Sequence, residues 1–118
     1  MLTIPGRFPN LNDYVRASHN EHARRRMKAE ADGAVAWAVL TNDVPRLKPP
    51  VRVTVDCYEK DARRDPDNVH SMARKFVLDG LVAAGVIKDD SRKYVEQCPD
   101  RVLTDRARPR VVVEVSDE

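Results

Sequence analysis

The stretch from Val51 to Gly85 changes its apolar period once, which predicts a β-strand, a short turn and an α-helix. Val51–Tyr58 places apolar residues at every second position, as a strand with one buried face does. From Asn68 onward apolar residues recur at helical spacing, and Gly85 is suited to end the helix. The predicted inward stripe of this helix is Val69, Met72, Ala73, Phe76, Gly80 and Ala83.

The rest of the chain supplies one further helix and three strands. Residues 2–4 predict a short strand, followed by a rigid polar loop through Asp13. Residues 20–40 predict a helix, and 41–50 predict a connector with three prolines. Residues 94–98 and 110–115 predict the last two strands. The order β-α-β-α-β-β indicates an α+β fold in which the helices pack on one mixed sheet.

The length of 118 residues fits one domain over residues 1–118. Hydrophobic residues make up 42% and charged residues 34% of the chain, which favours a globular over a disordered protein. No apolar run is long enough to span a bilayer and no signal peptide is recognisable, so we expect a cytoplasmic protein. Cys57 and Cys98 lack CxxC spacing, so we expect two reduced, mostly buried thiols.

The net charge of +2 gives no general signature of polyanion binding, but the basic residues are grouped. The groups are Arg24, Arg25 and Arg26 with Lys28; Arg63 with Arg64; and Arg106, Arg108 and Arg110. Each group alone is typical of a solvated surface. Beside an acidic site such a group favours contact with phosphate.

The turn at residues 63–68, Arg-Arg-Asp-Pro-Asp-Asn, carries the first acidic pair. Asp65 precedes a proline and is therefore biased toward extended backbone, so Asp65 and Asp67 should point to the same side. Two close carboxylates repel unless a cation neutralises them, and Mg²⁺ takes such oxygen ligands. Asp89 and Asp90 follow the helix, and one of them joins the pair if the next strand lies beside Val51–Tyr58.

A simpler alternative exists for each of these residues. Asp65 and Asp67 also suit a turn and a helix cap, with another turn at Asp89 and Asp90. Lys75 lies one helical turn before Asp79, which suits a surface ion pair as well as a contact to phosphate. The three histidines, His19, His22 and His70, have no metal-ligand spacing.

Residues 63–68, 75–81 and 85–91, with the opening segment 4–12, resemble the RusA family of Holliday junction resolvases. The resemblance implies a homodimeric, Mg²⁺-dependent endonuclease of bacterial or phage origin, with Mn²⁺ able to replace Mg²⁺. Such enzymes resolve four-way DNA junctions by paired incisions during recombination and repair. The family's catalytic and metal-binding acids fall on Asp65, Asp67 and Asp90.

The family's functional lysine falls on Lys75 if the helix is aligned from its C-terminal end, and on Ser71 if it is aligned from its N-terminal end. Asp79 matches a recurrent acid of the family. The expected partners are a second copy of the chain and branched DNA, whose backbone would contact Arg24, Arg25, Arg26, Lys28, Arg63 and Arg64. Three other functions stay open: a nuclease for forks and flaps, a non-catalytic protein that binds branched DNA, and a metal-binding interaction module.

Overall fold

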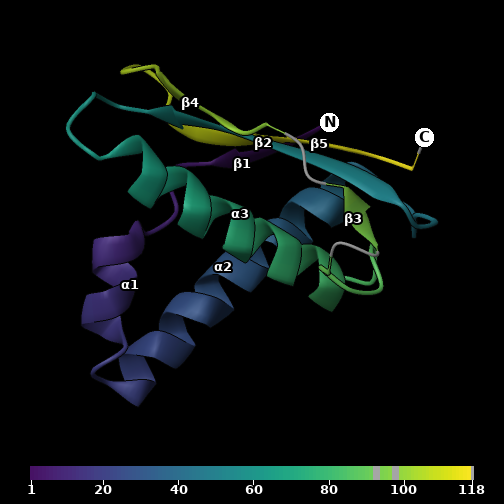
Figure 1. Cartoon of the computed structure of the whole chain (residues 1–118), viewed down its shortest axis with the longest axis horizontal. Coiled ribbons are helices and arrows are strands. Elements are labelled where there is room, and N and C mark those ends of the chain that lie inside the picture. The colour runs from purple at the N-terminus through teal and green to yellow at the C-terminus, as the bar shows by residue number, and fades with distance from the viewer. Residues whose placement is uncertain (92–93, 97–98, 118) are drawn as a thin grey trace.

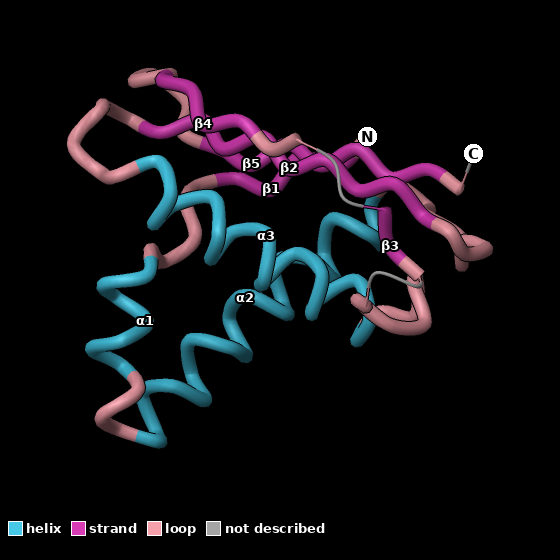
Figure 2. The backbone as a smooth tube through the Cα atoms, in the orientation of Figure 1, coloured by secondary structure: helices cyan, strands magenta, loops and turns pink. Residues whose placement is uncertain are grey.

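Three helices and five strands follow one another in the computed structural model, which describes residues 1–91, 94–96 and 99–117 (Figure 1). The elements are β1 (Leu2–Pro5), α1 (Leu11–Ala17), α2 (Glu21–Thr41), β2 (Val51–Glu59), α3 (Pro66–Ala83), β3 (Val95–Glu96), β4 (Arg101–Thr104) and β5 (Arg110–Ser116). The strands form one mixed sheet, and all three helices lie on the same side of it (Figure 2). The predicted single α+β domain is confirmed.

The strand β2 is central to the sheet, whose order is β1-β5-β2-β3 with β4 also paired to β2. β5 runs antiparallel to β1 and β2, whereas β3 and β4 run parallel to β2. Val95 lies beside Val51 at the start of β2, and Thr104 lies beside Glu59 at its end. β3 and β4 therefore follow the same edge of β2 in succession.

An ion pair between Arg74 and Asp100 fills the space between β3 and β4. Asp100 Oδ1 accepts the N–H of Val55 at 3.1 Å, and Arg74 Nη1 donates to the carbonyl of Val53 at 3.0 Å. The two side chains also meet each other, at 3.0 Å. These contacts satisfy backbone groups of β2 where no described strand pairs with them.

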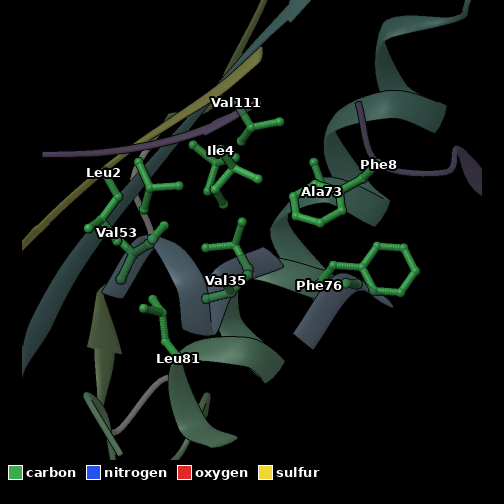
Figure 3. Packing of buried hydrophobic residues seen from close by; sticks show 14 of the residues in the cluster. Leu2, Ile4, Phe8, Val35, Val53, Ala73, Phe76, Leu81 and Val111 are labelled. Atoms are coloured by element: carbon green, nitrogen blue, oxygen red, sulfur yellow. The ribbon is translucent and has the colours of Figure 1, made fainter. Parts of the chain in front are cut away.

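The core lies between the sheet and the pair α2 and α3 (Figure 3). The predicted inward residues of β2 are all buried: Val51, Val53, Val55 and Cys57. The predicted stripe of α3 is also buried, except for Ala83, which is exposed. Where α2 and α3 cross, Gly80 lies against Val35, and a Cβ on Gly80 would come within 2.6 Å of the Cβ of Val35.

Two short elements were not predicted. The loop expected through Asp13 contains α1, whose N-cap Asn10 and Asp13 exchange side-chain to backbone hydrogen bonds in a capping box. β4 was missed because its four residues, Arg101–Thr104, are too few for an alternating pattern. No helix of the described residues is long and apolar enough to cross a membrane.

Cys57 is a buried free thiol, as expected. Burial raises the pKa of Cys57 to about 12, and the nearby charge of Glu59 adds to this. A thiol so resistant to ionisation suits a structural core position and not a nucleophile. The prediction for Cys98 falls outside the described residues.

Candidate metal and nucleic-acid site

Asp65 and Asp67 lie together at the N-terminal end of α3. Asp65 is the N-cap, with extended backbone at φ −61° and ψ 126°, and its carboxylate accepts the N–H of Asp67 at 2.9 Å. Pro66 takes the first helical position, which its fixed φ suits. The helix thus begins at Pro66 and not near Asn68. The extended alternation predicted across this pair is wrong beyond Asp65. The alternative of a turn that leads into a capped helix is correct, but the cap is Asp65 and not, as expected, Asp67 or Asn68.

The pair nevertheless presents carboxylate oxygens at one exposed place. The side chain of Asp67 is 94% exposed, and its Oδ1 lies 3.5 Å from Nε2 of His70. The first turn of a helix carries partial positive charge, which stabilises negative groups there. Two hard oxygen donors open to solvent fit one side of a Mg²⁺ coordination shell completed by water and phosphate. They are too few to enclose an ion without such further ligands.

Asp90 does not join this pair within the chain. Asp89 and Asp90 line a depression with Asp79, at the C-terminal end of α3. Because α3 has 18 residues at about 1.5 Å per residue, its ends lie about 27 Å apart. No group of three metal-binding side chains occurs within residues 1–91, 94–96 and 99–117.

The direction of β3 explains this separation. We expected the strand after Asp90 to lie beside β2, and β3 does so. It runs parallel to β2, however, and pairs with its first residues. The segment that carries Asp90 therefore reaches the start of β2, whereas Asp65 follows its end. The expectation that Asp90 returns to Asp65 and Asp67 within one chain is therefore wrong.

Lys75 stands on the exposed side of α3 between the two acidic groups. Its ammonium lies 3.2 Å from Asp79 Oδ2, which is the surface ion pair anticipated for these residues. Asp67, Ser71, Lys75 and Asp79 follow one another at four-residue intervals, so each is a neighbour of the next along the surface of the helix. Both alignments of the lysine position thus fall on this line, and Ser71 is the residue closer to Asp67.

Arg64 is held inside the fold. Its side chain is 15% exposed; it lies 3.1 Å from Glu59 Oε1, donates to the carbonyl of Phe8 at 2.9 Å, and is 3.7 Å from Asp13. Arg7 also reaches Glu59, at 3.5 Å. Arg64 therefore fastens the N-terminal loop to the end of β2, and is poorly placed to act as a free phosphate clamp. The side chain of the neighbouring Arg63 is 88% exposed; its guanidinium lies 3.8 Å from Asp61, whose carboxylate also accepts the Arg63 backbone N–H at 3.0 Å.

The basic group of α2 lies apart from the first acidic pair. Figure 1 shows the first turns of α2 at the end of the molecule remote from the sheet. Arg25 pairs with Glu21 at 2.8 Å, and Arg26 contacts His22 at 3.1 Å. Arg24 is exposed. This group therefore does not surround Asp65 and Asp67 as a basic rim.

Lys28 is the member of this basic group that lies beside the second acidic pair. It pairs with Asp32 at 3.1 Å and borders the depression that Asp89 and Asp90 line. Two cations that were not predicted as DNA contacts, Lys60 and Arg106, share a different depression with Arg63. The sequence shows both the charged turn after β2 and the basic run at 106–110. Only the pairing of β2 with β4 in the structure brings these two segments together.

No protein-family model matches this chain, and no curated protein matches it. The resemblance to RusA resolvases stays a prediction, made from the residues of segments 4–12, 63–68, 75–81 and 85–91.

Proposed function

We propose that the chain is a Mg²⁺-dependent endonuclease that acts on branched DNA, with the four-way junction as its main substrate. The observation that carries this proposal is the exposed pair Asp65 and Asp67 at the N-terminus of α3, two residues after the exposed Arg63. The resemblance to RusA resolvases supplies the substrate and the paired incisions. The same resemblance implies that the protein works in the cytoplasm of a bacterium.

The metal role follows from the donor chemistry of the pair. Asp65 and Asp67 would hold Mg²⁺, or Mn²⁺ in its place, through one carboxylate each. Mg²⁺ commonly binds through one or two carboxylates together with substrate phosphates, so DNA itself would complete the site. The ion would supply Lewis-acid polarisation of the scissile phosphate and a bound water of lowered pKa. The exposure of Asp67 leaves room for a DNA strand at this position.

Asp90 enters the proposal through a second copy of the chain. Because it lies at the opposite end of α3, a two-fold axis that sets the α3 helices of two copies antiparallel would bring Asp90 of one copy toward Asp67 of the other. A C2 dimer also offers two equivalent sites to a junction of near two-fold symmetry. Lys75, midway along the same exposed side, would then lie near the axis and could meet phosphate.

One observation favours a second candidate function, a non-catalytic protein that binds branched DNA. The separation of Asp90 from Asp65 within the chain leaves each acidic group with an ordinary structural role, as a cap or a turn. A protein of this type would bind junctions through its exposed cations and would need no metal. Unlike the nuclease, it would leave the bound DNA uncut.

The test is incubation of the purified protein with a labelled four-way junction, a fork and a linear duplex of the same sequence, each with Mg²⁺ and with EDTA. Paired nicks that need Mg²⁺ and are confined to the junction support the first proposal. Junction binding without nicks supports the second. Equal cleavage of linear duplex contradicts structure selectivity.

A further inference from the structure

A depression lined mainly by cations lies at the same end of the sheet as Asp65 and Asp67. It is lined by Lys60, Asp61 and Arg63 from the loop between β2 and α3, and by Thr104 and Arg106 from the end of β4 and the following loop. Figure 1 shows these two loops at one end of the molecule, beside the N-terminus of α3.

The parallel pairing of β2 and β4 brings these residues together. Glu59 and Thr104 are register partners at the last pair of the two strands. The N–H of Asp105 then donates to the carbonyl of Glu59 at 2.7 Å, which extends the pairing by one residue. Lys60 and Arg106 therefore leave the sheet side by side, although they are far apart in sequence.

The cations of this depression are less neutralised by nearby carboxylates than the neighbouring arginines are. Arg110 is paired to Asp105 at 2.7 Å, and Arg101 to Asp56 at 2.8 Å. In the described part of the chain, neither Lys60 nor Arg106 lies within ion-pair distance of a carboxylate, and both are exposed.

The guanidinium of Arg63 has a long contact of 3.8 Å with Asp61, the one acid in the lining, and the backbone N–H of Arg63 donates to the same carboxylate at 3.0 Å. Asp105, which follows Thr104, is already taken up by Arg110, whose hydrogen bond lowers the pKa of this carboxyl. The depression thus carries net positive charge that the protein itself leaves unbalanced. A ligand with negative charge would balance it.

We propose that this depression binds a backbone phosphate of the DNA strand that passes Asp65 and Asp67. The inference rests on the proposed nuclease function and adds a positioning surface to it. Arg63 precedes Asp65 by two residues, so their Cα atoms are at most about 7 Å apart. The phosphate held here is therefore one or two nucleotides from the phosphate at the acidic pair. Lys60 and Arg106 supply charge, and the exposed Thr104 supplies a hydroxyl donor, as phosphate contacts commonly use.

The experiment compares two double variants that each remove two positive charges. One is Lys60→Gln with Arg106→Gln. The matched control is Arg46→Gln with Lys48→Gln, two exposed residues of the connector before β2, at the opposite end of that strand. Fluorescence anisotropy of a labelled four-way junction in EDTA gives Kd over a range of salt concentrations, and thermal melting verifies that each variant is folded.

The expected result is a Kd raised about tenfold or more by the Lys60 and Arg106 pair, with the slope of log K against log salt reduced by about 1 to 2. The control pair should leave the slope near the wild-type value. The exchange Lys60→Arg with Arg106→Lys, which keeps both charges, should bind like wild type.

If the wild type binds the junction but the two neutralised double variants have equal salt-dependence slopes, this inference is overturned and the nuclease proposal stands. Absence of junction binding by the wild type at low salt overturns both.

Discussion

The carboxylate of Asp65 accepts the backbone N–H of Asp67 at 2.9 Å, so the first aspartate caps the helix on which the second stands. One side chain thereby serves two roles in the proposed site. It fixes the start of α3, and it offers a remaining carboxylate oxygen beside the exposed Asp67.

Substitutions at Asp65 separate these two roles. Asparagine caps a helix as well as aspartate does, whereas alanine costs about 1 kcal/mol of stability. We expect Asp65→Asn to keep the wild-type free energy of unfolding and to lose Mn²⁺ binding, because the charge is gone. Asp65→Ala should lower the free energy of unfolding and should also lose Mn²⁺ binding. Urea denaturation and Mn²⁺ titration measure the two quantities. If Asp65→Asn binds Mn²⁺ with wild-type affinity, Asp65 caps the helix but does not bind the metal.

The helix start shows what the sequence could and could not provide. The Asp-Pro-Asp pattern correctly marked a turn that leads into a helix, because proline restricts both itself and its predecessor. Whether Asp65 or Asp67 caps depends on where the first helical residue falls, and neighbouring polar residues satisfy the same backbone donors almost equally well. The local pattern could not choose between them.

Mixed dimers test where Asp90 acts. If each site combines Asp67 of one copy with Asp90 of the other, Asp67→Asn and Asp90→Asn homodimers are both inactive. A mixed dimer of the two variants then contains one intact site and should nick one strand of a four-way junction. Coexpression with two different tags allows the mixed dimer to be isolated and assayed. No nicking by the mixed dimer, or full activity of Asp90→Asn alone, contradicts the cross-copy site.

Strand direction was the second limit on prediction from sequence. Val51–Tyr58 was identified correctly because apolar residues stand at every second position, and residues 110–115 because they are rich in β-branched valine. Whether the strand after Asp90 runs parallel or antiparallel to β2 is set by tertiary packing, including the Arg74–Asp100 pair, which is distant in sequence. The position of Asp90 relative to Asp65 follows from that direction together with the length of α3.

The crossing of α2 and α3 depends on Gly80. A methyl group there would lie 2.6 to 2.8 Å from three side-chain atoms of the fully buried Val35, so Gly80→Ala should destabilise the fold by about 1 to 3 kcal/mol through overpacking. Gly33 is exposed on α2 with nothing within 4 Å of such a methyl, so Gly33→Ala should stabilise by about 1 kcal/mol. Urea denaturation gives both values, and stabilisation by both changes would disprove the close crossing.

The ion pair of Arg74 and Asp100 should matter far more than an exposed pair. Asp100 is 6% exposed, so Arg74→Ala leaves an unpaired buried charge, which typically costs about 3 to 5 kcal/mol. Arg25→Ala, which removes a pair whose partners are 75% and 65% exposed, should change stability by about 0.5 kcal/mol or less. Equal effects of the two substitutions on the free energy of unfolding would show that the Arg74–Asp100 pair does not stabilise the sheet more than an exposed pair does.

The central claim is that the acidic pair at the start of α3 makes this protein a metal-dependent nuclease. The most direct measurement is Mg²⁺-dependent cleavage of a labelled four-way junction by the wild type, Asp67→Asn and Asp43→Asn. Asp43 is an exposed aspartate beyond the end of α2 with φ 51°, a conformation that asparagine tolerates well. The account predicts paired nicks by wild type and Asp43→Asn, and a loss of about 100-fold or more in Asp67→Asn with folding and junction binding retained. Cleavage by Asp67→Asn at the wild-type rate would contradict it.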